Sequence, residues 1–480
     1  MKTVWRGRVR MGISPERSQP PARSKSEDGY RGRVLELLKS KGLKVGDAVV
    51  ARDGRLTYTG ILMPRSELED DSHIVLKLQD GYNVGISIES LEIERLVQTD
   101  AAGGMRPPSM GALPRSGPSA AQQAAEGGGI TLPRVSIVST GGTIASRVDY
   151  RTGAVSPALS AEDLYRAVPE LGELAEIRTE ILFSILSENM SPKHWASIAQ
   201  SVERHIRAGA DGVVVTHGTD TMGYTAAALS FALRNLPVPV VLVGSQRSSD
   251  RPSSDAALNL KGAVLTAARA PFAEVCVLMH ASPSDDSLAV HRGTRARKMH
   301  TSRRDAFRSV NSPLLAEVRG GEVLPAPGIK FRPRGAGGAL EVKPHFEEDV
   351  VLIKSFPGMP PDVFDPIIHR GFRGIVLEGT GLGHVPERVF SQVKRAVDSG
   401  ITVVMASQCI HGRVNMNVYS TGRELLSIGV IPAGDMLPET ALVKLMWVLG
   451  QTEDRERVRE LFTADLAGEL SERSEYEGVP

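Results

Sequence analysis

Two stretches of the sequence decide the fold of most of the chain: Val135-Ser-Ile-Val-Ser-Thr-Gly-Gly-Thr143 and Gly212-Val-Val-Val-Thr-His-Gly-Thr-Asp220. Each begins as a short apolar run rich in β-branched residues, which is typical of a buried strand. Each then changes to glycine and hydroxyl residues, which indicates a tight turn. Because ligands bind at the carboxyl ends of strands in open parallel sheets, we expect functional residues in these turns.

The pattern around these stretches alternates between strands and helices. Apolar runs at residues 238–243 and 275–279 predict two more strands. A helix is predicted to begin at Pro192, with Ser191 as its N-cap, and to stop at Gly209. This alternation predicts an α/β domain with a parallel sheet over residues 132–325.

A second α/β domain is predicted at residues 348–455. It contains apolar runs of strand length at residues 349–353, 374–377 and 401–405. One helix is predicted between the last two runs, at residues 387–399. A segment with Gly, Pro and polar residues connects the two domains at residues 326–347, and residues 456–480 form a C-terminal segment.

The part before residue 132 has a different character. Residues 1–29 hold Lys, Arg, Pro and Ser without apolar periodicity, which predicts a disordered basic tail. A short helix and closely spaced short strands predict a small SH3-like β-barrel over residues 30–98. Residues 99–131 are mostly Gly, Ala, Pro and Ser, which is typical of a flexible linker.

Composition narrows the class of protein. The 480 residues carry 57 Lys and Arg against 56 Asp and Glu, so the net charge of +1 gives no global attraction to nucleic acid or membranes. Two cysteines are too few for a disulfide framework or a zinc site. No apolar run of signal-peptide length follows the Arg-rich amino terminus, no stretch has the length of a membrane span, and no metal-binding motif such as His-Glu-x-x-His occurs. We therefore expect a cytoplasmic protein with no metal site.

The turn motifs resemble a known family of amidohydrolases. Thr140-Gly-Gly-Thr-Ile-Ala145 and Thr216-His-Gly-Thr-Asp-Thr-Met222 look like the two signatures of bacterial-type L-asparaginases, and the resemblance covers about residues 133–450. It implies an asparaginase-like two-domain core in which Thr143 is the nucleophile on a side-chain amide. It also implies that Thr219 and Asp220 work together with a lysine.

The same resemblance points to that lysine and to the substrate site. Lys298 lies in Arg295-Ala-Arg-Lys-Met-His-Thr-Ser302, which is similar to the lysine segment of the family. Without the resemblance, Lys298 looks like a solvated residue of the basic loop 292–308. The arginines of this loop would favour a neutral lysine, while Asp220 nearby would oppose that shift. The predicted substrate-binding residues are Gly142, Gly218, Ser187, Glu188 and Tyr150; Glu188 departs from the family, and Tyr150 could equally be a packing residue.

A second resemblance includes the small domain. The segments Lys44-Val-Gly-Asp47, Gly60-Ile-Leu-Met-Pro64 and Ile74-Val-Leu-Lys-Leu78, with the motifs above, resemble the D-type subunits of archaeal glutamyl-tRNA(Gln) amidotransferases over about residues 30–455. The resemblance implies release of ammonia from glutamine for a partner, the E-type subunit, which uses ATP and Mg²⁺ to amidate Glu-tRNA(Gln). It also implies a homodimer within a heterotetramer.

The chain's own motifs agree with this division of labour. No Gly-x4-Gly-Lys-(Ser/Thr) phosphate loop is present, so ATP is expected on the partner, and Gly379-Thr-Gly-Leu-Gly383 is interpreted as a turn. Two alternatives stay open. One is a stand-alone cytoplasmic L-asparaginase with an extra interaction domain. The other is a catalytically silent relative that binds tRNA through residues 1–29 and the basic loop.

Overall fold

The computed structural model describes residues 30–54, 56–63, 71–78, 83–89, 91–96, 132–141, 146–148, 155–157, 168, 170–247 and 254–473. The predicted tail at residues 1–29 and the whole of the predicted linker at residues 99–131 therefore lie outside the described residues. The small domain and the larger α/β unit are each described by themselves.

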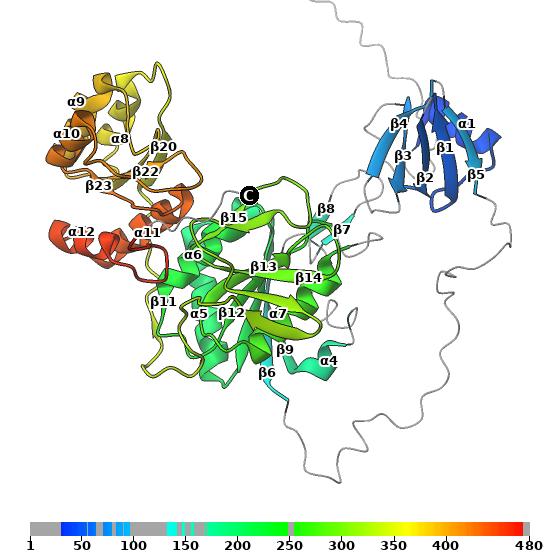
Figure 1. The fold of residues 1–480 in the computed structure, drawn as a ribbon, viewed down its shortest axis with the longest axis horizontal. Helices are drawn as coiled ribbons and strands as arrows, with labels where there is room; N and C mark the ends of the chain where they lie inside the picture. Colours follow the sequence, from blue (N-terminus) through cyan, green and yellow to red (C-terminus); the bar gives the residue numbers. More distant parts are fainter. Residues whose placement is uncertain are drawn as a thin grey trace, which may run out of the picture. The chain divides into compact units, whose positions relative to one another are not determined.

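The small domain is one helix and a five-stranded antiparallel sheet (Figure 1). Its elements are α1 (Gly32–Ser40), β1 (Ala48–Asp53), β2 (Leu56–Leu62), β3 (His73–Leu78), β4 (Asn83–Ser87) and β5 (Leu91–Arg95), and the strand order is β4-β3-β2-β1-β5. Tyr30 is buried, and its hydroxyl donates to Met63 O at 2.8 Å and accepts from Val75 N at 3.0 Å. This side chain therefore ties the start of the helix to the sheet.

The α/β unit is built on an eight-stranded sheet with the order β18-β17-β14-β13-β12-β10-β6-β9. The strands are β6 (Arg134–Gly141), β9 (Glu176–Ile185), β10 (Gly212–Thr216), β12 (Val240–Val243), β13 (Val275–His280), β14 (Ser287–Arg292), β17 (Ala316–Arg319) and β18 (Glu322–Pro325). Strands β9, β6, β10, β12 and β13 are parallel, whereas β14, β17 and β18 are antiparallel to their neighbours. The sheet is thus mixed, where the sequence predicted a parallel one.

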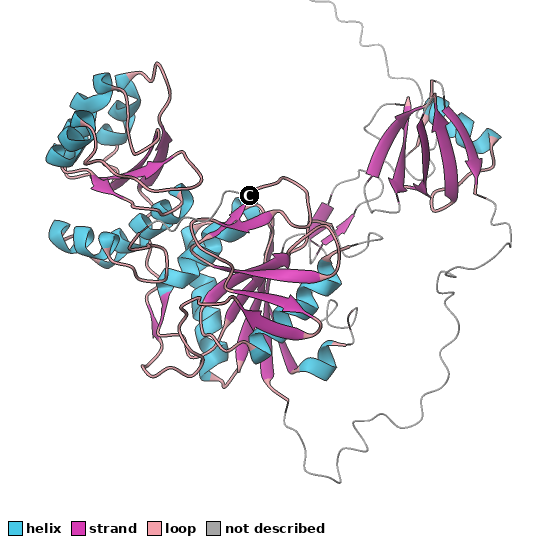
Figure 2. Ribbon diagram, in the orientation of Figure 1, coloured by secondary structure: helices cyan, strands magenta, loops and turns pink. Residues whose placement is uncertain are grey.

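Helices cover both faces of this sheet (Figure 2). They are α4 (Leu171–Leu174), α5 (Pro192–Arg207), α6 (Met222–Ala232) and α7 (Ala256–Arg269). Alternate strand residues face opposite layers: Val214 packs with α7, and Val213 and Val215 pack with α5 and α6. A strand buried on both faces needs an unbroken apolar run, which explains the sequence of β10.

The second lobe has a parallel four-stranded sheet of β20 (Val350–Lys354), β21 (Gly374–Gly379), β22 (Thr402–Ser407) and β23 (Ile431–Pro432). Its helical elements are η4 (Pro361–Phe364), α8 (Asp365–His369), η5 (Glu387–Val389), α9 (Phe390–Asp398), α10 (Ser420–Ile428), α11 (Pro438–Gln451) and α12 (Arg455–Thr463). The helix predicted at residues 387–399 is thus a 3-10 turn followed by α9. The segment predicted as C-terminal to the second domain includes nearly all of α12.

Helix α6 joins the two lobes of the α/β unit. Its residues Met222 and Ala226 pack on the large sheet, and its Ala227 and Phe231 pack with Trp447 of α11. A helix that is buried on nearly all sides has to be apolar all round, and small residues such as alanine let both neighbours approach closely. Because Thr219 and Asp220 come just before this helix, its position fixes theirs.

The remaining elements are short. They are the strand pairs β7 (Ser146–Val148) with β8 (Val155–Pro157), β11 (Leu233–Arg234) with β19 (Glu341–Val342), and β15 (Ala296–Lys298) with β16 (Phe307–Ser309), and the turn η3 (Ser187–Asn189). The basic loop expected at residues 292–308 is therefore largely the hairpin of β15 and β16. Among the described residues, no helix is both long and apolar enough to cross a membrane.

Candidate active site

The candidate site lies at the carboxyl ends of neighbouring parallel strands. Strands β6 and β10 pair in register, with Ser139 opposite Thr216. The Thr140 hydroxyl donates to Thr216 O at 2.8 Å, which links the ends of the two strands. Thr143 follows the last residue of β6 by two positions in the sequence, and the turn after β10 carries Thr219 and Asp220.

Two glycines are required by close backbone contacts at this edge. Gly141 has φ +102°, and a Cβ there would lie 2.5 Å from Ile185 O. A Cβ on Gly244 would lie 2.7 Å from His217 O and 2.8 Å from Thr219 Cγ2. Any other residue would force the backbone apart, so Gly141 lets the end of β6 approach β9, and Gly244 lets the turn after β12 approach the turn after β10.

Lys298 contacts both residues of the second signature. Its Nζ donates to Thr219 Oγ1 at 2.8 Å and to Asp220 Oδ1 at 2.8 Å. The Lys298 side chain is 13% exposed and that of Asp220 is 68% exposed, and Thr219 is buried. The structure thus brings together a hydroxyl, an amine and a carboxylate that the sequence could group only through a family resemblance.

A buried histidine holds the turn that carries Thr219. His217 Nδ1 lies 2.7 Å from Gly218 O, and its Nε2 lies 2.8 Å from Thr225 Oγ1. A carbonyl can only accept, so Nδ1 carries the proton and the Thr225 hydroxyl donates to Nε2 while it accepts from Trp195 Nε1 at 3.1 Å. Burial lowers the pKa of His217 to about 4, although the hydrogen bond to Gly218 opposes this. His217 is therefore neutral near pH 7 and acts as a fixed support.

Helix α7 holds the turn after β12 against Thr219. The Asp255 carboxylate accepts from the backbone N–H groups of Gln246 and Arg247 at 3.0 to 3.1 Å, and Asn259 Nδ2 donates to Gly244 O at 2.9 Å. Ser245 Oγ and Gln246 Nε2 are buried and have no hydrogen-bond partner in the described part of the chain. Buried polar atoms of this kind, beside Thr219, are available to a bound ligand.

The arginines near Lys298 are all paired with carboxylates. The four pairs are Arg295–Asp435 (2.9 Å), Arg297–Glu439 (3.4 Å), Arg303–Asp305 (2.8 Å) and Arg304–Asp285 (2.6 Å). The sequence-based expectation set these arginines against Asp220 alone and did not include their own carboxylate partners. The reason is that two of the carboxylates come from the second lobe, more than 130 positions away in the sequence.

The other predicted site residues are placed as follows. Thr143, Gly142 and Tyr150 lie outside the described residues. Gly218 is buried in the turn after β10. Ser187 is buried, and its carbonyl accepts from the Thr221 hydroxyl at 2.7 Å, so the segment of Ser187 and Glu188 reaches the same turn; Glu188 itself is exposed.

Sequence reasoning did not assign roles to His217, Ser245, Gln246 or Asn259. His217 stands inside the second signature, and a histidine at the end of a fully apolar strand is a signal that could have drawn attention to it. Asn259 has no such signal, because its contacts depend on how α7 packs. Within the described residues, no cluster of three or more His, Cys, Asp or Glu side chains could hold a metal ion.

Models of known families match three separate stretches of the chain. Residues 134–326 match the asparaginase N-terminal domain, residues 349–462 the glutaminase/asparaginase C-terminal domain, and residues 43–96 the GatD N-terminal domain. The D-type glutamyl-tRNA(Gln) amidotransferase subunit of Thermofilum pendens is 51% identical, over 94% of this chain and 98% of that protein. This chain belongs to the GatD family. The GatD protein of Methanothermobacter thermautotrophicus is also 51% identical, over 93% of this chain and 98% of that protein.

Solved L-asparaginases share the α/β unit of this GatD family member. The thermostable L-asparaginase from Thermococcus kodakarensis is 37% identical, with a TM-score of 0.62, and the match covers 70% of this chain and 99% of that one. L-asparaginase I from Vibrio cholerae is 31% identical, with a TM-score of 0.63, and the match covers 71% of this chain and 100% of that one. The predicted family and the predicted asparaginase-like fold are confirmed.

Proposed function

We propose that this chain is the glutaminase component that releases ammonia from glutamine for the conversion of Glu-tRNA(Gln) to Gln-tRNA(Gln). The observation that carries the proposal is the Lys298 amine, which lies 2.8 Å from both Thr219 Oγ1 and Asp220 Oδ1 at the strand ends. A partly buried amine between a hydroxyl and a carboxylate is suited to moving a proton during attack on an amide.

The chemistry has two halves. In the first, the Thr143 hydroxyl adds to the side-chain amide carbon of glutamine, its proton passes to the leaving nitrogen, and ammonia departs to leave an ester. In the second, water adds to the ester carbon, glutamate leaves and the hydroxyl is restored. Thr219, Lys298 and Asp220 relay protons, while Gly142, Gly218, Ser187, Glu188 and Tyr150 bind the substrate.

The rest of the reaction belongs to other molecules in this proposal. An amidating partner, the E-type subunit, binds ATP and Mg²⁺, activates the glutamate of Glu-tRNA(Gln) and receives the ammonia. This chain forms a homodimer within a heterotetramer, meets the tRNA through that complex and works in the cytoplasm. The supporting fact is that the curated GatD relatives match both the small domain and the amidohydrolase unit.

The experiment compares Thr143→Ala with the unaltered chain in complex with the amidating partner. We expect the variant to lose glutamine-dependent amidation of the tRNA and to keep ammonia-dependent amidation, because the partner's chemistry is untouched. Substantial glutamine hydrolysis by the variant would refute the role of Thr143.

The same assay separates the alternatives. A stand-alone L-asparaginase would hydrolyse asparagine at full rate without the partner, and the solved L-asparaginases give this alternative its support, since they match 70% of the chain. A catalytically silent relative that binds tRNA would show no amidase activity even in the complex.

A further inference from the structure

Lys298 is carried by a short segment, a turn followed by strand β15, that runs along helix α6. We call residues Gly293–Lys298 the lysine strap. A Cβ on Gly293 would lie 2.8 Å from Ser230 Oγ and 3.1 Å from Ala226 O, and a Cβ on Gly223 would lie 2.9 Å from Ala296 O. The strap therefore follows α6 in backbone contact, from the end of the helix back to its start, where Thr219 and Asp220 are.

From Arg295 to Lys298, successive side chains of the strap point to opposite lobes. Ala296 is buried in the core of the first lobe, and Lys298 reaches Thr219 there. Arg295 and Arg297 instead reach carboxylates of the second lobe. The last three of these residues form strand β15, in which side chains alternate, and Arg295 directly precedes it, so a shift of the arginines moves the backbone that carries the lysine.

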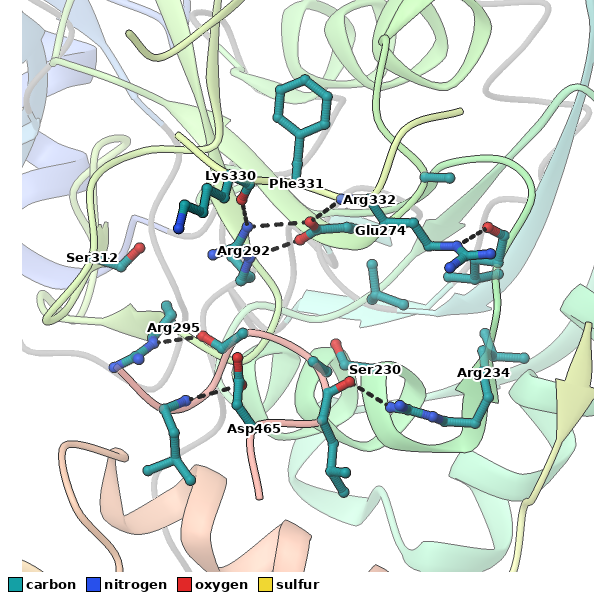
Figure 3. A pocket seen from close by; sticks show the side chains of 18 of the residues that line it. Ser230, Arg234, Glu274, Arg292, Arg295, Ser312, Lys330, Phe331, Arg332 and Asp465 are labelled. Atoms are coloured by element: carbon teal, nitrogen blue, oxygen red, sulfur yellow. Dashed lines mark hydrogen bonds and ion pairs between the residues drawn. The ribbon is translucent and has the colours of Figure 1, made fainter. Parts of the chain in front are cut away.

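Arg295 fixes the outer part of the strap. Its side chain is fully buried; Nη1 contacts Asp435 Oδ2 at 2.9 Å, Nε donates to Gly468 O at 2.9 Å and Nη2 donates to Ser471 Oγ at 2.9 Å. Figure 3 shows this guanidinium turned toward the chain segment of Asp465, at the edge of a cavity of about 420 Å³. A buried guanidinium with this many acceptors has little freedom to move.

Two threonine hydroxyls, one from the second lobe and one from the strap, also connect the strap to the second lobe. The Thr440 hydroxyl of α11 donates to Thr294 O at 2.9 Å, and the Thr294 hydroxyl donates to Ala467 O at 3.1 Å. The strap is therefore fixed to two different segments of the second lobe, the start of α11 and the chain after α12.

Arg297 is the contact nearest to the lysine. It lies 3.4 Å from Glu439 in the first turn of α11, and the side chains are 33% and 13% exposed. Burial raises the pKa of the Glu439 carboxyl, and the Arg297 guanidinium opposes that shift without reversing it. Glu378 and Tyr224 are the other titratable groups that face this carboxyl, and Glu378 also raises its pKa.

We propose that Arg295 and Arg297 are positioning residues, through which Asp435 and Glu439 of the second lobe set the place of the Lys298 amine relative to Thr219. This inference rests on the proposed function of Lys298. According to this inference, contacts from the second lobe hold the proton-relay residues of the first lobe in position. A displacement of about 1 Å at a catalytic group can cost roughly 100-fold in rate, so this contact matters even though it is remote from the substrate.

The test uses Arg297, because Arg295 is too deeply buried for its loss to be separated from misfolding. The variants are Arg297→Met, Glu439→Gln and Arg297→Lys, which keeps the charge. The matched control is Glu453→Gln, which removes an exposed partner of Arg373 at 3.3 Å in the same lobe. Glutamine hydrolysis is measured for each in the complex with the amidating partner.

For Arg297→Met and Glu439→Gln we expect kcat to fall by roughly 10-fold to 100-fold, while KM for glutamine changes less than about twofold. Arg297→Lys should recover most of the rate, and the control should match the unaltered chain. A kcat equal to that of the control, or no recovery in Arg297→Lys, would overturn the inference.

A second measurement does not depend on activity. In a crystal structure of Arg297→Met, we expect Lys298 Nζ to lie beyond hydrogen-bond distance from Thr219 Oγ1. An unchanged contact near 2.8 Å would overturn the inference even if the enzyme assay failed. Absence of glutaminase activity in the unaltered complex would instead refute the proposed function alone.

Discussion

Replacing Asp220 by asparagine should separate catalysis from stability. The change keeps the shape of the side chain and removes the charge that faces Lys298 Nζ at 2.8 Å. Asp220 is 68% exposed, so water already screens the pair, and pairs of this kind contribute only about 0.2 to 1 kcal/mol to folding. We therefore expect the free energy of unfolding to fall by less than about 1 kcal/mol.

The effect on the rate should be much larger. A group that positions or accepts a proton in the transition state contributes about 100-fold to 10,000-fold, which corresponds to about 3 to 5 kcal/mol of activation free energy. Glutamine hydrolysis by the complex gives the rate, and denaturant unfolding of the isolated chain gives the stability. The two magnitudes differ enough for one pair of measurements to decide between a catalytic and a structural carboxylate.

The control is an ion pair of the same kind away from the site. Lys394 and Asp398 lie 2.7 Å apart on α9, and both side chains are 59% exposed. Asp398→Asn should cost as little stability as Asp220→Asn and leave the rate unchanged. Equal rates for the two variants would refute the assignment of Asp220 to the proton relay.

Two further predictions concern stability. Lys444 and Glu469 form a pair at 2.5 Å with both side chains fully buried. Glu469→Gln removes the carboxylate in contact with this buried amine and should lower the free energy of unfolding by about 3 to 5 kcal/mol, measured by denaturant titration at pH 7. Burial lowers the pKa of His217 from 6.5 to about 4. As the pH falls from 6.5 to about 4, the unfolded state therefore binds a proton at this histidine and the folded state does not. Stability should therefore fall by about 3 kcal/mol between pH 7 and pH 4 through this group, and His217→Gln should flatten the slope of unfolding free energy against pH; an unchanged slope would contradict the neutral, buried histidine.

The predictable part of the fold is the part where a local pattern has one structural solution. Strand β10 is fully buried, so Gly212-Val-Val-Val-Thr216 is an unbroken apolar run. Helix α5 has Ser191 before Pro192, and a capping box between Ser191 and His194 forms as a local feature. Such signals do not depend on the rest of the chain.

The strands that were not predicted lack such a signal. Strand β9, Glu176–Ile185, lies at the edge of the sheet and alternates between partly buried and exposed residues, with charges in its first half. Strands β17 and β18 are only four residues long, and β18 is another edge strand. Their direction is set by hairpin connections within the mixed sheet, and no residue composition separates them from loops.

The site was predictable as a set of motifs and not as a geometry. Thr219 and Asp220 are adjacent in one turn, but Lys298 lies 79 positions after Thr219, and only the course of the strap along α6 brings its amine to the turn. The sequence around Lys298 is rich in arginine, so a count of local charges predicts a cationic environment.

The partners of those arginines show why that count fails. Asp435 and Glu439 belong to the second lobe, and each contacts an arginine of the strap. A positive segment in the sequence therefore becomes a neutral one in the fold, because its charges are paired with carboxylates that hold the segment in place. At Arg295 three different nitrogens have acceptors, so this role requires the geometry of a guanidinium. At Arg297 one carboxylate is the partner, so a positive charge alone is sufficient. Lysine should then replace Arg297 and fail to replace Arg295, a contrast that no argument from net charge produces.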